Sequence, residues 1–166
     1  MFREMRRNRQ ALSYEECETI LNRAASGVLA VSGDDGYPYA VPLSFVYADS
    51  KIYFHCALTG HKLDAIAGND KVSFCVIDQD QVVPEKYTTF FRSVIAFGRA
   101  KILTDAQEKR AALELLAARY SPDQPEGRQQ EVDALFKNVC MVEISIEHMT
   151  GKEAIELVRE KENQNG

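Results

Sequence analysis

Gly60, His61 and Lys62 are the residues best placed to bind a ligand, because they begin a helical pattern directly after the apolar segment Lys51–Cys56. Thr59 is the expected N-cap of this helix, since its hydroxyl can accept a free N–H of the first turn. The first turn presents unsatisfied backbone N–H groups and the positive end of the helix dipole, and a lysine ammonium beside them completes a site for an anion. The alternative is a solvated lysine at an ordinary helix start, so the tripeptide needs support from its surroundings.

A proline inside a strand pattern is the second candidate feature. Side chains alternate with period two from Tyr37 to Tyr47, but Pro42 lies in the middle of this run. Proline cannot donate to a strand ladder, so the strand should be irregular or at an edge there. Neighbouring backbone groups are then free to meet a ligand, although a bulge without a ligand is an equal alternative.

The remaining pattern predicts the elements that position these residues. Ser13 and Glu16 form a capping box for a helix that runs to about Ala24, and Gly33–Gly36 has the composition of a hairpin turn. Gly98 is the expected bulge in a long strand, and residues 78–87 are expected to form a loop. Strands are predicted at residues 28–31, 37–47, 51–56, 71–77, 88–103 and 139–146. Further helices are predicted at residues 60–67, 104–120 (with a capping box from Thr104 and Gln107) and 129–136.

Tight turns between most of these strands predict an antiparallel sheet. Six apolar strands are better closed into a small barrel than left with long open edges. The expected fold is therefore mainly β with flanking helices, as a six-stranded antiparallel split β-barrel. One domain should cover residues 1–166, with an N-terminal arm at 1–11 and a helical tail at 151–166.

Composition restricts the function classes. The formal net charge of −5 argues against a general binder of nucleic acid or anionic membranes. The four cysteines lack metal-ligand spacing and indicate buried thiols in a reducing compartment, so we expect no metal site. No segment is apolar and long enough to cross a membrane, and no apolar region follows the basic N-terminus. A cytoplasmic protein is expected.

Several motifs in order resemble those of one protein family. They are Val28-Leu29-Ala30, Asp35-Gly36-Tyr37-Pro38-Tyr39, Val41-Pro42-Leu43, Ile52–Cys56, Gly60-His61-Lys62, Arg92-Ser93-Val94 and Gly98-Arg99-Ala100. Together they resemble the FMN-binding split barrel, the fold of pyridoxamine 5′-phosphate oxidase and its relatives. The phrase Tyr53-Phe54-His55-Cys56-Ala57 and the ending Ile146–Glu153 are similar to the nitroimidazole-resistance branch of that family.

This resemblance implies a homodimer with FMN bound at the subunit interface. The residues implied to lie along the flavin ring are Val41, Pro42, Leu43 and Ser44. Those implied near the ribityl chain and phosphate are His55 and Cys56, with His61 and Lys62 holding the phosphate. Those implied to reach the flavin of the other subunit are Arg92, Ser93 and Val94, although a surface ion pair is an equal alternative for Arg92.

Departures from the oxidase pattern argue against pyridoxamine 5′-phosphate oxidation itself. The oxidase carries an arginine where this chain has Val41, and His61 replaces the first residue of its Arg-Lys phosphate pair. The segment Glu147–Glu153 also lacks the arginine of the oxidase's substrate-binding motif.

The expected function is therefore an FMN-dependent oxidoreductase that reduces a small acceptor, for example a nitroaromatic compound. No protein nucleophile with an adjacent base is evident, so the cofactor should supply the chemistry and no catalytic residue is assigned. One alternative is a protein that binds flavin without turnover. Another is a haem-binding relative with His55, His61 or His148 as ligand. His148 is otherwise expected to be structural.

Overall fold

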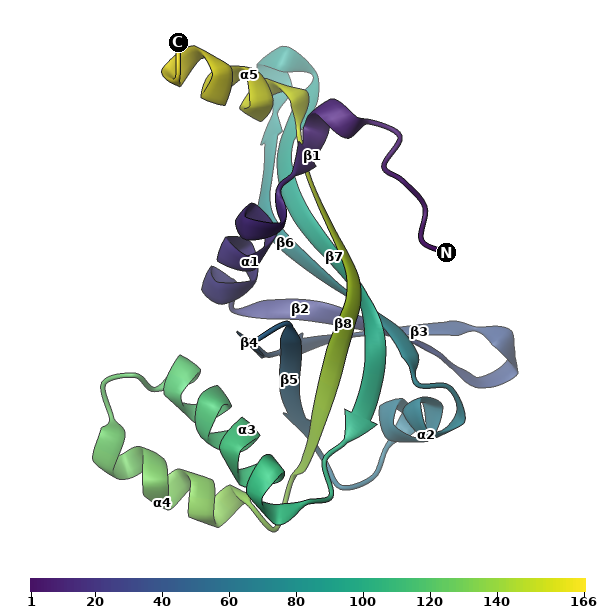
Figure 1. The fold of residues 1–166 in the computed structure, drawn as a ribbon, viewed down its shortest axis with the longest axis vertical. Coiled ribbons are helices and arrows are strands. Elements are labelled where there is room, and N and C mark those ends of the chain that lie inside the picture. Colours follow the sequence, from purple (N-terminus) through teal and green to yellow (C-terminus); the bar gives the residue numbers. More distant parts are fainter.

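The sheet follows one continuous path, in the order β3-β2-β6-β7-β8-β5-β4, with β1 paired to β8. The computed structural model describes all residues from 1 to 166, and every strand pair in it is antiparallel (Figure 1). The strands are β1 (Ala11–Leu12), β2 (Ser26–Ser32), β3 (Pro38–Ser44), β4 (Val46–Ala48), β5 (Lys51–Cys56), β6 (Lys71–Val83), β7 (Thr88–Ile102) and β8 (Cys140–Glu153). The helices are α1 (Tyr14–Arg23), α2 (His61–Gly68), α3 (Ala106–Tyr120), α4 (Pro125–Leu135) and α5 (Ile155–Gln164), with 3₁₀ turns at Asn8–Gln10, Asp34–Gly36 and Pro84–Lys86.

The predicted fold class is confirmed, but the sheet has eight strands and not six. Two differences account for the number. The short strand β1 forms in the expected arm, and the expected strand 37–47 is divided into β3 and β4 at Phe45. Because β3 and β4 are the two ends of the sheet and pair only with β2 and β5, the barrel remains split between them.

The break at Phe45 is stabilised from outside the sheet. The Phe45 side chain is fully buried, and its backbone N–H donates to the Tyr120 hydroxyl of α3 at 2.9 Å. Tyr120 in turn donates to the carbonyl of Ala25. The position of β3 at the sheet edge confirms the expectation that Pro42 lies in an edge-like strand.

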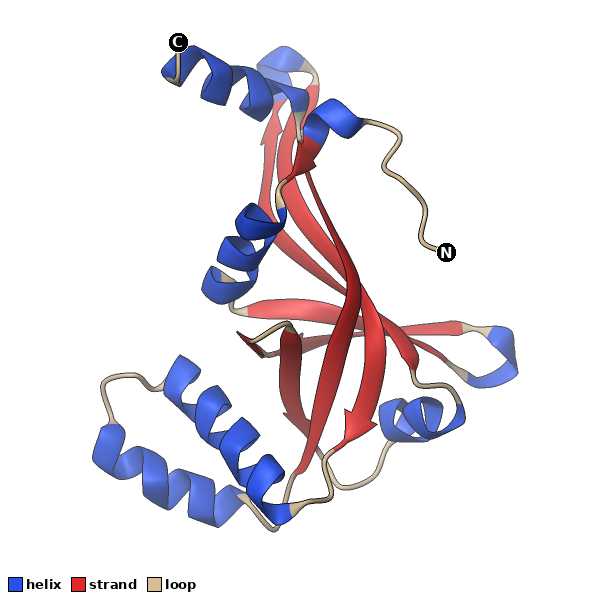
Figure 2. Cartoon of the chain, in the orientation of Figure 1, coloured by secondary structure: helices blue, strands red, loops and turns tan.

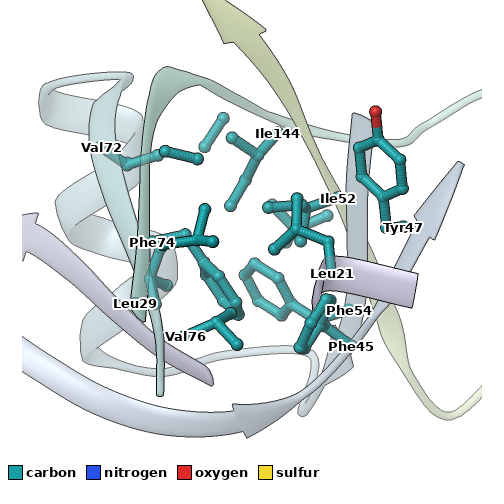
Figure 3. Packing of buried hydrophobic residues seen from close by; sticks show 14 of the residues in the cluster. Leu21, Leu29, Phe45, Tyr47, Ile52, Phe54, Val72, Phe74, Val76 and Ile144 are labelled. Atoms are coloured by element: carbon teal, nitrogen blue, oxygen red, sulfur yellow. The ribbon is translucent and has the colours of Figure 1, made fainter. Parts of the chain in front are cut away.

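The main core lies inside the curved sheet (Figure 3). Phe45 and Phe74 pack edge to face at 5.0 Å, and Phe54 is fully buried in the same core. The helix α1 adds Ile20 and Leu21 to this core, and its predicted capping box is present. A second core cluster, built on Leu113, Leu116, Val132 and Met141, holds the α3–α4 hairpin against the outer side of β5 and β8.

Two strands extend well beyond the ends that their patterns predict. Residues 78–83 continue β6 after a bulge and pair with β7, so the predicted loop at 78–87 is wrong. The strand β8 continues to Glu153, so the predicted helical tail begins at Ile155 and not at residue 151. Polar residues remain in these strands because each has a paired partner strand, and tertiary pairing outweighs local propensity. Figure 2 shows these extensions as a narrow sheet beyond the barrel.

Of the remaining local predictions, the bulge at Gly98 is confirmed and the starts of α3 and α4 are wrong. The register shift between Phe97 and Gly98 in the β7–β8 pairing confirms the predicted bulge. Thr104 does not cap α3, because the Asp105 carboxylate accepts from the N–H groups of Gln107 and Glu108. The helix α4 begins at Pro125, four residues before the predicted start. No helix combines the length and the apolar character needed to span a lipid bilayer.

Candidate functional site

The corner between β5 and α2 has the features of an anion site. Gly60, and not Thr59, is the N-cap of α2, and no side chain caps the helix. The space around the Gly60 Cα is open, since a Cβ built there has no atom within 4 Å. Gly60 also has a φ of +153°, a backbone conformation that residues other than glycine rarely adopt. An anion could therefore approach the free end of this helix closely.

Lys62 supplies the charge at this corner. No carboxylate lies within 4 Å of its ammonium, so Lys62 takes part in none of the thirteen ion pairs of the chain. Its charge also acts on the thiol of Cys56, at the end of β5. Burial raises the pKa of Cys56 to about 11, and Cys140 acts in the same direction, while the Lys62 charge lowers it. Cys56 is therefore a neutral thiol near neutral pH and no candidate nucleophile.

His61 is held at the edge of the corner by an aromatic contact that the sequence did not suggest. Its ring stacks on Tyr39 of β3 with centroids 4.2 Å apart, and its Nε2 lies 3.8 Å from an Asp34 carboxylate oxygen. These contacts join α2 to the β2–β3 hairpin. They orient His61 at the start of α2.

The residues predicted along β3 divide between its two faces. Val41 and Leu43 are partly buried against the main core, on the same side as Tyr39 and Cys56. Pro42 and Ser44 are exposed on the other face. His61 and Lys62 thus lie at the corner and Cys56 ends the strand before it, while Val41 and Leu43 pack against the main core.

His55 points away from this corner. It follows Tyr53, whose side chain packs against the second core cluster, and it lines a cavity together with Ser44 and the α3–α4 hairpin. Adjacent residues of a strand face opposite sides, so His55 and Cys56 cannot both contact one small group on one face of β5.

Arg92 belongs to a network of buried ion pairs and lies far from the corner within one chain. Its guanidinium donates to Glu153 at 3.0 Å and to Asp78 at 3.2 Å. Asp78 also accepts from Arg23, and Glu153 pairs with Lys161 at 2.7 Å. An ion pair was the alternative expected for Arg92. Ion pairs are present, but they are largely buried and not at the surface. The backbone N–H of Ala100 donates to the carbonyl of Asp70, which lies just after α2. Ala100 is eight residues from Arg92 along β7, so Arg92 lies about 27 Å from this end of α2 at the rise of a strand.

Ser93 and Val94 follow Arg92 in the middle of the sheet. Ser93 is half-buried and pairs with Ile77 and Lys152. The Val94 side chain is fully buried in the main core, so only its backbone could lie near a ligand. Within a single chain, neither residue pairs with a residue at the start of α2.

The three histidines lie in separate environments. His148 is stacked under Phe2 of the N-terminal arm with centroids 4.6 Å apart, and its buried Nε2 has no hydrogen-bond partner. His55 lines the cavity beside α3 and α4, and His61 lies on Tyr39. No group of three or more potential metal ligands occurs in the structure.

The family model described as pyridoxamine 5′-phosphate oxidase matches residues 13–153. No curated protein matches the chain. A candidate 5-nitroimidazole antibiotic resistance protein from Bacteroides thetaiotaomicron is 24% identical, with a TM-score of 0.72 and 86% of each chain covered.

Two further solved structures extend the comparison. An FAD-binding protein from Mesorhizobium loti is 28% identical, with a TM-score of 0.65, covering 87% of this chain and 96% of its own. A flavocytochrome from Azotobacter vinelandii is 19% identical, with a TM-score of 0.75, covering 91% of this chain and 72% of its own.

The fold and these matches define an antiparallel split-barrel protein. Because the family model spans most of the chain, the protein belongs to the pyridoxamine 5′-phosphate oxidase family. The resemblance inferred from the sequence motifs is thereby confirmed.

Proposed function

We propose that this protein is an FMN-dependent oxidoreductase that reduces a small acceptor, with the flavin phosphate bound at the start of α2. One observation carries the proposal: Lys62 has no carboxylate partner and lies at an uncapped helix N-terminus beside an open glycine. A phosphate fits this corner because it matches the charge of Lys62 and can accept the free N–H groups.

The predicted binding residues have distinct parts in the proposal. Lys62 and His61 bind the phosphate, while Val41 and Leu43 provide an apolar edge along the ring and exclude water. Bound flavin would supply the hydride-transfer chemistry, which no side chain of this chain can supply. The relatives described as FAD-binding and as a flavocytochrome support a flavin, and the terminal phosphate of FMN suits a site with a single cation.

The first test is flavin uptake. Purified protein should bind FMN with an absorbance that survives gel filtration, and it should bind riboflavin more weakly because riboflavin lacks the phosphate. FAD is the comparison for cofactor identity. Oxidation of NADH or NADPH with a nitroaromatic acceptor, followed by absorbance, should then show turnover. Uptake of FMN without turnover would favour the flavin-binding alternative, and failure to bind any flavin would overturn the proposal.

We also propose that two copies associate through the outer face of the sheet. Pro42, Val28, Cys75 and Ile95 are successive cross-strand neighbours on this face, and Ile95 is 39% exposed. Phe97, in the next row, is 36% exposed and packs against Phe2 of the N-terminal arm. An apolar row across four strands that no helix covers is a suitable interface between two copies.

This association predicts the effect of a charge in the row. Ile95→Glu should shift the protein from dimer to monomer in light scattering at micromolar concentration, because the carboxylate would be buried without a partner. Leu115→Glu on α3 is the matched control, since Leu115 has nearly the same exposure, 42%, and lies outside this face. A wild-type monomer, or an Ile95→Glu variant that still dimerises, would contradict the proposal.

A further inference from the structure

Two of the four cysteines face each other across neighbouring strands. Cys56 is the last residue of β5 and Cys140 is the first residue of β8, and the antiparallel register places them directly opposite each other, at the lower end of the barrel in Figure 1. Opposed residues of such a pair project from the same face of the sheet, and here Cys140 belongs to the main core and Cys56 packs against it. Their Cα atoms are roughly 4.5–5.5 Å apart in an antiparallel pair, which is within the range of about 4.4–6.8 Å that a disulfide requires.

The other two cysteines have no cysteine opposite them. Cys75 is opposed by Val28 of β2 and by Ile95 of β7, and Cys17 of α1 packs against Gly151 of β8. All four cysteines are free thiols in the structure. The first pair described is therefore the one positioned for a disulfide between paired strands.

The two thiols of this pair differ in exposure. Cys140 is 9% exposed, whereas Cys56 is only half-buried and is followed by the exposed segment 57–60, so a small oxidant reaches Cys56 first. Burial and the neighbouring Cys140 raise the pKa of Cys56 to about 11, and Lys62 is the charged group that lowers it. Roughly one Cys56 in ten thousand is therefore a thiolate at about pH 7, which is too few for a catalytic nucleophile but sufficient for a slow exchange that occurs once.

We propose that Cys56 and Cys140 form a reversible disulfide, with a small organic disulfide as the oxidant. The Cys56 thiolate attacks one sulfur of the oxidant, forms a mixed disulfide and releases one small thiolate. The Cys140 thiolate then attacks the Cys56 sulfur, which forms the bond within the chain and releases the second small thiolate. The two protons lost by the cysteines are taken up by the two released thiolates, so one oxidant is reduced to two thiols for each bond formed.

The position of the pair determines how the bond acts and how fast it forms. The bond joins the end of β5, before α2, to the start of β8, after α4, and it closes a long loop, so it should stabilise the fold by restricting the unfolded chain. Because thiolate is scarce, the exchange should be slow, and its rate should rise about tenfold per pH unit between about pH 7 and pH 9. The site goes beyond the proposed flavin corner, because no step involves a bound ligand.

Oxidised glutathione is the probe for this site. The purified protein is incubated with it, the remaining thiols are alkylated, and the masses of the intact chain and of its tryptic peptides are measured. Wild type should lose two hydrogens per chain and show one link, between the peptides of Cys56 and Cys140, and dithiothreitol should restore both thiols. Cys140→Ser should keep one glutathione on Cys56, because no second thiol displaces it. Cys75→Ser is the matched control, since Cys75 is also half-buried, and it should form the link at the wild-type rate.

The wild-type peptide map identifies the link even if a variant fails to fold. The proposal is overturned if wild type carries only mixed disulfides at equilibrium, or if the link joins another pair of cysteines. It is also overturned if the linked protein unfolds at a lower urea concentration than the reduced protein, because the native fold would then not accommodate the bond. A rate that is equal at about pH 7 and pH 9 would exclude the scarce Cys56 thiolate as the attacking group and would overturn the proposal as well.

Discussion

Lys62→Ala should weaken FMN binding by roughly ten- to a hundredfold, the largest effect expected at the corner. The ammonium has no ion-pair partner in the structure, so its removal leaves the phosphate with only His61 and the helix N–H groups. The change should not disturb the fold, because Leu63 and Ile66 are the buried residues of α2 and Lys62 is only half-buried. Titration of the flavin-free protein with FMN, followed by flavin fluorescence, measures the loss.

Riboflavin provides the control for this prediction. It lacks the phosphate, so wild type and Lys62→Ala should bind it about equally. Lys71→Ala, just beyond the other end of α2, should leave both affinities unchanged. His61→Ala should cost less than Lys62→Ala, because the imidazole offers the phosphate a single hydrogen bond whereas the lysine ammonium has three donors and a full charge. An equal loss of riboflavin and FMN affinity in Lys62→Ala would show that Lys62 does not bind phosphate.

Local patterns predicted most of the fold because each helix and strand of the barrel has a buried face. The capping box at Ser13, the edge position of Pro42 and the bulge at Gly98 were all predicted from single residues whose chemistry allows few conformations. The extension of β6 was not predictable in this way. Residues 78–83 are mostly polar, and they form a strand only because β7 lies beside them.

The candidate site was predicted in part. Gly60, His61 and Lys62 could be found because a helix start with a cation is a local feature. The stacking of Tyr39 on His61 depends on how the β2–β3 hairpin meets α2, which no spacing in the sequence indicates. The separation of His55 from Cys56, in contrast, follows from the alternation of side chains along a strand, so their adjacency in the sequence is itself a sufficient signal.

The cavity beside α3 and α4 shows a different limit of prediction from sequence. Its polar residues Arg128 and Glu131 lie on a helix whose predicted range began only at residue 129, and nothing in the sequence relates that helix to Ser44 or His55. These residues meet because Tyr120 fastens the end of α3 to the break at Phe45. Sites formed by the packing of distant elements are therefore the part that a single sequence does not show.

Arg92→Met should destabilise the protein by about 3 kcal/mol, the second large effect that we expect. Arg92 is 20% exposed and lies between Asp78 and Glu153, whose side chains are 9% and 4% exposed. Its removal leaves these two nearly buried carboxylates with only Arg23 and Lys161 as partners. Urea unfolding followed by circular dichroism measures the change in free energy.

Arg99→Met is the matched control for this prediction. Arg99 lies on the same strand and also pairs with two carboxylates, Asp70 and Glu147, but it is 50% exposed. Exposed ion pairs contribute about 0–1 kcal/mol, so this variant should be close to wild type in stability. The comparison separates the effect of burial from the loss of an arginine.

The pH dependence of stability gives a second measurement of the network. Burial alone would raise the pKa of Asp78, but hydrogen bonds from Arg23 and Arg92 outweigh it and hold the pKa below its usual value of 3.8. A carboxyl with a lowered pKa stabilises the fold above its unfolded pKa, and this contribution is lost as the pH falls through the folded pKa. The stability difference between wild type and Arg92→Met should therefore be largest near neutral pH and should narrow below about pH 4.

FMN affinity of the same variant separates the structural role of Arg92 from the flavin contact implied by the resemblance. Because Arg92 Nε donates to Glu153 and Nη1 to Asp78, Arg92 should affect stability more than cofactor binding. We expect Arg92→Met, measured at a temperature where it is fully folded, to bind FMN within about threefold of wild type, a change of less than 1 kcal/mol. A variant of unchanged stability that binds FMN tenfold more weakly would reverse this conclusion, and would instead place Arg92 at the flavin of a partner subunit.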